Sequence, residues 1–253
     1  MFATAIKFNA PTERKLKESI VSANSRHHPK VLLLHGWGGS YEKVWKSTGF
    51  VSQLEEAGLE PVAVDLPGHG HAQGSYDPAD YSDLAGEVLL GLPDSVPIYG
   101  IGYSLGAKII LEIERRSPGR FSRLILAGVG GNAFAPEKLG HVVASALEEG
   151  VTSDTPAGVR ALVEYGIAAG NDARSIAACL RRQPNPVLSP AAVANVKCPT
   201  LLVCGSQDSI ALPLEPLADA LPRCSLKVLT DIDHLHLPES DDFRNAALAF
   251  LAA

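Results

Sequence analysis

Short apolar runs alternate along this chain with longer amphipathic stretches, and this alternation restricts its fold more than any other feature. The apolar runs that end at glycine or a polar residue are Val31–Leu34, Pro61–Val64, Val96–Ile101, Leu124–Ala127, Thr200–Val203 and Leu226–Leu229. Such runs suit strands that are buried on both faces of a parallel sheet. The amphipathic stretches are 44–57, 81–90, 105–116, 214–221 and 243–252. The alternation predicts a doubly wound α/β domain.

The alternation is interrupted between residues 131 and 196, where no strand-like run occurs. Helical pieces at 141–149, 157–169 and 173–182 dominate this segment. A segment of this length without a strand is typical of an inserted helical layer rather than a loop. We therefore expect a core domain of residues 1–130 and 197–253 and a helical cap of residues 131–196. Near the N-terminus, Thr4–Phe8 and Ser19–Val21 are predicted as edge strands.

Composition narrows the class of protein. The 253 residues carry a net charge of −6 and are 46% hydrophobic and 20% charged, which is typical of a folded globular chain. Nucleic acid is not an expected partner, because phosphate binding needs a concentrated basic face. The N-terminus lacks the apolar stretch of a secretory signal and no run of about 18 apolar residues occurs, so we expect a cytoplasmic protein without a membrane span. The four cysteines form no C-x-x-C pair and are expected to be reduced.

One pentapeptide, GYSLG at residues 102–106, matches the motif G-x-S-x-G. It follows an apolar run and opens a helical stretch, which is the context that the motif requires. A tight strand-to-helix turn exposes the Ser104 hydroxyl above a helix N-terminus, which favours a developing anion. The alternatives are a glycine turn without chemistry and a dinucleotide fingerprint. The glycines are spaced G-x-G-x-x-x-G rather than G-x-G-x-x-G and lie mid-chain, so no cofactor is expected.

A serine nucleophile needs a base, and the base needs an orienting acid. Asp208 follows the fifth apolar run and His234 follows the sixth, so both are placed where parallel strands end. The chain order Ser104, Asp208, His234 is one of the known orders for such a triad.

Other residues compete for two of these roles. His236 is the alternative base, because it lies only two residues after His234 in an extended-looking segment. The alternative acids are Asp65, Asp231 and Asp233. Asp208 has a further interpretation as a helix-capping residue.

Five motifs in this order resemble the α/β-hydrolase superfamily: HGWGG at 35–39, DLPGHG at 65–70, the Ser104 elbow, GSQD at 205–208 and DH at 233–234. The resemblance implies a mostly parallel sheet of about eight strands flanked by helices, with the insert as a cap over the site. It assigns the backbone N–H groups of Trp37 and Leu105 to an oxyanion hole, where one donor typically contributes about 3 kcal/mol. It also assigns Gly36, Trp37 and Tyr103 to substrate binding, and His35 to supporting the oxyanion loop. Asp233 replaces the usual glycine before the histidine, which keeps His236 open as the base.

The resemblance implies a serine hydrolase of small carboxylic esters or related acyl compounds. An acyl-enzyme forms on Ser104, with His234 as general base and acid and Asp208 as orienting acid. Haloalkane dehalogenases and epoxide hydrolases use an aspartate nucleophile, which this elbow lacks. One alternative is triad-dependent proton abstraction or C–C cleavage, similar to the menaquinone-pathway synthase, with Lys108 as a carboxylate-binding residue. A second alternative is a hydrolase-like ligand receptor. A third is a catalytically inactive interaction protein, which an intact triad disfavours. No metal is expected, and the protein is expected to be a monomer or homodimer.

Overall fold

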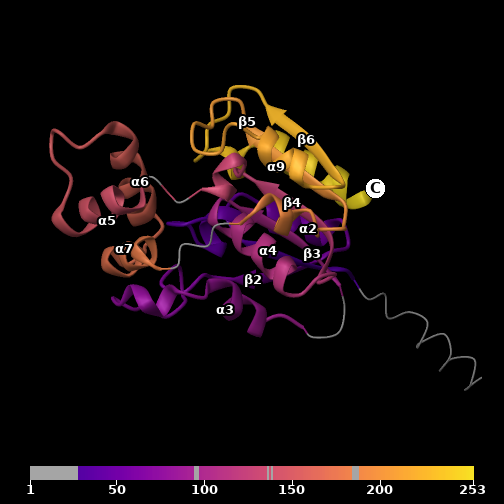
Figure 1. Ribbon diagram of the computed structural model, residues 1–253, viewed down its shortest axis with the longest axis horizontal. Coiled ribbons are helices and arrows are strands. Elements are labelled where there is room, and N and C mark those ends of the chain that lie inside the picture. Colours follow the sequence, from indigo (N-terminus) through magenta and orange to yellow (C-terminus); the bar gives the residue numbers. More distant parts are fainter. Residues whose placement is uncertain (1–27, 94–96, 136, 138, 184–187) are drawn as a thin grey trace, which may run out of the picture.

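A parallel sheet forms the centre of the computed structural model, which describes residues 28–93, 97–135, 137, 139–183 and 188–253. Its strands are β1 (Lys30–Leu34), β2 (Glu60–Val64), β3 (Ile98–Tyr103), β4 (Phe121–Ala127), β5 (Thr200–Gly205) and β6 (Cys224–Leu229). They lie in the order β2-β1-β3-β4-β5-β6, and every neighbouring pair is parallel (Figure 1). The predicted parallel α/β sheet is confirmed.

The described residues hold six of the about eight strands that the resemblance implied. The predicted edge strands at Thr4–Phe8 and Ser19–Val21 lie outside the described residues, as does Val96 at the start of the third predicted run.

Helices cover both faces of the sheet. They are η1 (Glu42–Lys46), α2 (Phe50–Glu56), η2 (Pro78–Tyr81), α3 (Leu84–Leu90), α4 (Leu105–Arg116), α8 (Pro190–Val193), α9 (Glu215–Ala220), η4 (Leu237–Glu239) and α10 (Asp241–Ala252). On β1, Val31 and Leu33 pack with η1, α2 and α10, whereas Leu32 and Leu34 pack with α3, α4, α8 and α9. Successive side chains of a strand point to opposite faces, so one apolar run supplies two cores.

Two predicted helices are shorter in the structure than in the sequence analysis. The stretch 44–57 is interrupted by Gly49, whose φ of 79° is the left-handed region that ends a helix. The stretch 81–90 begins as a helix only at Leu84, because the Asp83 carboxylate accepts the Gly86 N–H over 3.1 Å and caps it there.

The predicted burial on both faces was wrong for the two edge strands, β2 and β6. In β2, Ala63 is exposed, and the other residues of the apolar run are only partly buried: Pro61, Val62 and Val64. Leu226 and Val228 are each 48% exposed. β6 is the last strand of the described sheet, so it has one neighbouring strand instead of two.

Between β4 and β5 the chain forms η3 (Gly131–Phe134), α5 (Gly140–Glu149), α6 (Ala157–Ala168) and α7 (Ala173–Arg181). Helices α5, α6 and α7 lie together to one side of the sheet (Figure 1). Val143, Ala144, Val159, Ala177 and Leu180 form a small apolar cluster of their own there. No helix in the described part of the chain is long and apolar enough to cross a membrane.

Candidate active site

The GYSLG pentapeptide forms a sharp turn between a strand and a helix. β3 ends at Tyr103 and α4 begins at Leu105, so Ser104 alone makes the connection. Its φ of 53° and ψ of −113° form a strained conformation that few non-glycine residues adopt. The Ser104 N–H donates to the Ala127 carbonyl over 2.8 Å, which anchors the turn to β4.

Both glycines of the motif are required by close backbone contacts. A Cβ atom on Gly106 would overlap the carbonyl oxygens of Leu34 and His35, where α4 crosses the end of β1. A Cβ on Gly102 would lie 2.7 Å from the backbone nitrogen of Ala107. The motif therefore lets strand, turn and helix pack without side chains between them.

The Gly106→Ala variant is expected to lose about 3 kcal/mol or more of unfolding free energy, because backbone atoms must move to admit the methyl group. Urea unfolding curves measure the loss. The control is Gly158→Ala, at an exposed helical position with nothing within 4 Å of the added methyl. It is expected to be neutral or stabilising by up to about 1 kcal/mol. Equal stability of the two variants would contradict the packing argument.

The structure brings the three predicted triad residues together. His234 Nε2 lies 3.0 Å from Ser104 Oγ, and His234 Nδ1 lies 2.8 Å from Asp208 Oδ2. An ionised carboxylate only accepts hydrogen bonds, so Nδ1 donates to Asp208 and Nε2 is left to accept the Ser104 hydroxyl. This is the tautomer in which the imidazole can receive the serine proton.

Asp208 is fully buried at the end of β5. Burial raises the pKa of a carboxyl group, but hydrogen bonds to His234 and to the Ala211 N–H outweigh it and hold the pKa of Asp208 below its ordinary value. Its other oxygen, Oδ1, accepts the N–H groups of Ile210 and Ala211 over 3.0 and 2.9 Å. No helix begins at Asp208, since the next helix, α9, starts at Glu215, so the helix-capping interpretation is wrong. Oδ1 instead holds the turn after β5, and Oδ2 holds His234.

The competing residues lie elsewhere. The side chain of His236 is 68% exposed, and its Nδ1 pairs with Asp233 Oδ1 over 2.8 Å. Asp231 accepts from the Gln207 amide, and Asp65 accepts the N–H groups of Tyr41 and His71. Among the histidines of the described residues, only His234 forms hydrogen bonds with the side chains of Ser104 and Asp208.

The predicted oxyanion donors face the same cavity as Ser104. Leu105 is the first residue of α4, where backbone N–H groups have no partner within the helix. Among the described residues, no acceptor takes the backbone N–H of Leu105 or of Trp37. Gly36 touches the turn, since a Cβ on Gly36 would lie 3.1 Å from Ser104 Cβ. An oxyanion hole requires two free donors near the nucleophile, and the assignment of these two N–H groups to it stays a prediction.

Tyr103 has a structural role in addition to its predicted contact with substrate, which stays a prediction. It lines the cavity, but its hydroxyl donates to the His234 carbonyl over 2.7 Å. Burial raises the pKa of Tyr103 well above its ordinary value, so the hydroxyl stays a donor. The residue before the nucleophile therefore also holds the backbone of the base.

His35 and His69 form a buried pair behind the oxyanion loop. His35 Nδ1 donates to the Gly36 carbonyl over 2.7 Å, and His35 Nε2 accepts the Leu66 N–H over 3.0 Å. His69 Nδ1 donates to the Pro67 carbonyl over 2.9 Å, while its buried Nε2 has no partner among the described residues. Burial and the neighbouring His35 lower the pKa of His69 to about 3.

This lowered pKa predicts acid sensitivity. Between the unfolded pKa of about 6.5 and the folded value of about 3, the unfolded chain binds one more proton at this histidine, so stability falls as pH falls. The slope is up to about 1.4 kcal/mol per pH unit. His69→Asn keeps a donor for Pro67 and is expected to make the slope shallower by up to that amount. Urea midpoints between pH 7.5 and 4.5 test this, and an unchanged slope would contradict it.

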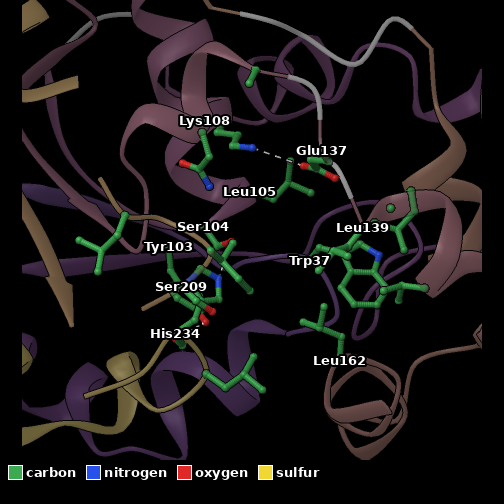
Figure 2. A pocket seen from close by; sticks show the side chains of 18 of the residues that line it. Trp37, Tyr103, Ser104, Leu105, Lys108, Glu137, Leu139, Leu162, Ser209 and His234 are labelled. Carbon is green, nitrogen blue, oxygen red and sulfur yellow. Dashed lines mark hydrogen bonds and ion pairs between the residues drawn. The ribbon is translucent and has the colours of Figure 1, made fainter. Parts of the chain in front are cut away.

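The triad opens into a cavity of about 570 Å³. Its walls combine core residues with apolar side chains of the insert: Leu139, Val143, Leu162 and Leu180. In Figure 2, Ser104 and His234 lie on one side of the cavity, and Trp37, Leu139 and Leu162 lie on the other. A cavity of this size and polarity fits a small, largely apolar ligand.

A cluster of three charged side chains lies at the cavity. The sequence analysis named one of them, Lys108, and missed the other two, Glu137 and Arg182. Lys108 Nζ lies 3.6 Å from Glu137 Oε1 (Figure 2), and Arg182 Nη2 lies 3.6 Å from the same oxygen. Burial lowers the pKa of Lys108. Glu137 precedes α5 and Arg182 follows α7, so the cluster links both ends of the segment from α5 to α7 to Lys108 of α4. Ion pairs between distant segments leave no local pattern in a sequence.

Comparison with known proteins places the chain in a family. The sequence model of the Alpha/beta hydrolase family matches residues 31–247. The chain therefore belongs to this family, the class that its sheet and serine elbow already define.

Its relatives include esterases. The chain is 40% identical over 100 residues to a pimeloyl-[acyl-carrier protein] methyl ester esterase of Methylococcus capsulatus, covering 39% of this chain and 36% of that enzyme. It is 27% identical over 213 residues to the enzyme of the same name from Nitrosospira multiformis, covering 73% of this chain and 79% of that one. Among solved structures, a carboxylesterase from Nitrososphaera gargenis aligns with a TM-score of 0.70 at 20% identity, over 89% of this chain and 90% of that one. At that identity the structure shows a shared fold.

Proposed function

We propose that this chain is a carboxylic ester hydrolase that forms an acyl-enzyme on Ser104. The observation that carries the proposal is the hydrogen-bonded series Ser104, His234 and Asp208 at the wall of an apolar cavity. Free backbone donors beside Ser104 complete the set of groups that acyl transfer needs. The family and its esterase relatives support the same class.

The reaction begins with attack of Ser104 Oγ on the ester carbonyl. His234 Nε2 takes the hydroxyl proton, and Asp208 stabilises the imidazolium through its hydrogen bond to Nδ1. The carbonyl oxygen becomes an anion between the N–H groups of Trp37 and Leu105. His234 then gives its proton to the alcohol as the ester bond breaks, which leaves the acyl group on Ser104.

Water completes the cycle. His234 removes a proton from a water molecule that attacks the acyl-enzyme, and it returns the proton to Ser104 Oγ as the carboxylic acid leaves. We propose that residues 131–196 act as a cap, whose apolar side chains shelter the acyl chain.

The methyl esters named for two relatives suggest the substrate class. Methanol needs almost no room, so the cavity would hold chiefly the acyl chain. We propose methyl esters of short and medium acyl chains as substrates.

Pre-steady-state hydrolysis of p-nitrophenyl butyrate tests the acyl-enzyme. A burst of p-nitrophenol equal to the enzyme concentration, followed by slower turnover, is expected when acylation precedes a slower deacylation. Methyl butyrate should give butyrate and methanol. Release of p-nitrophenol no faster than in buffer would refute the proposal.

One observation favours the alternative function, triad-dependent proton abstraction or C–C cleavage. Lys108 lines the same cavity as Ser104, where its ammonium could bind a substrate carboxylate. Glu137 already supplies an anionic partner for that ammonium, which makes a substrate carboxylate less necessary there. Product analysis separates the two, since a lyase would release no alcohol from a simple ester.

A further inference from the structure

The turn that carries Trp37 is not part of the sheet. β1 ends at Leu34, and residues 36–39 form a β-turn closed by the Gly39 N–H and the Gly36 carbonyl, 3.1 Å apart. Gly38 has a φ of 75°, as the third residue of a type II β-turn requires. The Gly36 carbonyl shares its peptide plane with the Trp37 N–H, and it accepts both the Gly39 N–H and His35 Nδ1. The Gly38 carbonyl, in the peptide plane that carries the Gly39 N–H, is held by contacts from outside the turn.

Asn171, between α6 and α7, supplies such contacts. Its side-chain N–H₂ donates to the Gly38 carbonyl over 2.9 Å and to the Gly166 carbonyl over 3.0 Å. Its side-chain oxygen accepts the Gly70 N–H over 2.8 Å. The side chain is buried, and this arrangement of donors and acceptors fixes the orientation of the amide. One residue of the insert thus joins the oxyanion turn, α6 and the loop after β2.

Two more contacts join the same turn to the insert. The Trp37 indole N–H donates to the Ile176 carbonyl in α7 over 2.9 Å. The backbones of Gly38 and Gly166 pass so closely that a Cβ on Gly38 would lie 3.2 Å from Gly166 Cα. These contacts leave no space for the turn to shift while the insert stays in place.

We propose that Asn171 is a positioning residue for the oxyanion hole, and that the insert is thereby a structural part of the reaction centre as well as its cover. Asn171 holds the Gly38 carbonyl, which shares its peptide plane with the Gly39 N–H. The Gly39 N–H donates to the Gly36 carbonyl, and that carbonyl shares its peptide plane with the Trp37 N–H. Losing this hold lets the Trp37 N–H turn away from the developing oxyanion. The role rests on the ester hydrolase function proposed above.

Kinetics with methyl butyrate and inhibition by butylboronic acid test the role. The boronate forms a tetrahedral adduct with a reactive serine, so its affinity reports the oxyanion hole. Asn171→Ala is expected to lower kcat about 10- to 100-fold and to raise the boronate Ki by a similar factor. KM should change by less than about twofold, because the ground-state contacts remain. Asn171→Asp keeps the acceptor for Gly70 but loses the donor for Gly38, so it should match Asn171→Ala.

The control is Glu148→Gln, which weakens the ion pair of Glu148 and Arg181 inside the insert without touching the turn. A lowered Tm with unchanged kcat in Asn171→Ala, as in the control, would overturn the role. If Asn171→Ala does not fold, Asn171→Asp decides by the same measurements, because it keeps the size of the side chain and the acceptor for Gly70 but loses the donors for Gly38 and Gly166. A wild-type protein without ester turnover would instead refute the proposed function.

Discussion

Replacing Ser104 by alanine is expected to lower kcat for p-nitrophenyl butyrate by about a millionfold, to the rate that binding and the oxyanion hole alone sustain. In the proposed mechanism the Ser104 oxygen bonds to the acyl group. No other described side-chain oxygen accepts a hydrogen bond from or donates one to His234 Nε2. Alanine keeps the backbone bond to Ala127, so the fold should persist.

Steady-state rates and circular dichroism on the same samples check this result. The control is Ser122→Ala, an exposed serine on β4, which should leave kcat within about twofold of wild type. A folded Ser104→Ala protein with more than a tenth of wild-type activity would show that another residue is the nucleophile.

The second large effect concerns the choice of base. His234→Ala is expected to lose nearly as much activity as Ser104→Ala, because the two residues act as one unit. His236→Ala should change kcat by less than about threefold, since its exposed imidazole pairs with Asp233. The double variant Ser104→Ala, His234→Ala should be no slower than either single variant. A greater loss at His236 would contradict the hydrogen bonds of the structure.

The sheet was predictable because buried parallel strands leave continuous apolar runs, whereas its edges were not. β6 has the composition of a central strand, yet its position at the edge exposes Leu226 and Val228. The order of strands in the sheet depends on the packing of segments far apart in the chain, so it cannot be predicted from a local sequence pattern. The helix break at Gly49, by contrast, does have a local signal, because a glycine inside a helical pattern often ends a helix. The predicted helix 44–57 did not take that signal into account.

The candidate site was predictable where short motifs define it. The elbow places Ser104 through local sterics alone, and the strand ends place Asp208 and His234. The sequence did not decide between His234 and His236. The segment before them contains a turn in which Asp231 adopts a φ of 58°, and no sequence motif predicts that turn. Asn171 was missed because its bonds to Gly38 and Gly70 join residues more than 100 positions apart. The docking of the insert creates those bonds.

Mass spectrometry after treatment with a fluorophosphonate tests most directly whether Ser104, His234 and Asp208 act together as a catalytic triad. A serine becomes phosphonylated only when a base withdraws its proton and nearby donors stabilise the product. The wild-type protein should gain one adduct, on Ser104, and the folded His234→Ala variant should react slowly or not at all. An adduct on another residue, or equal labelling of both proteins, would contradict the account.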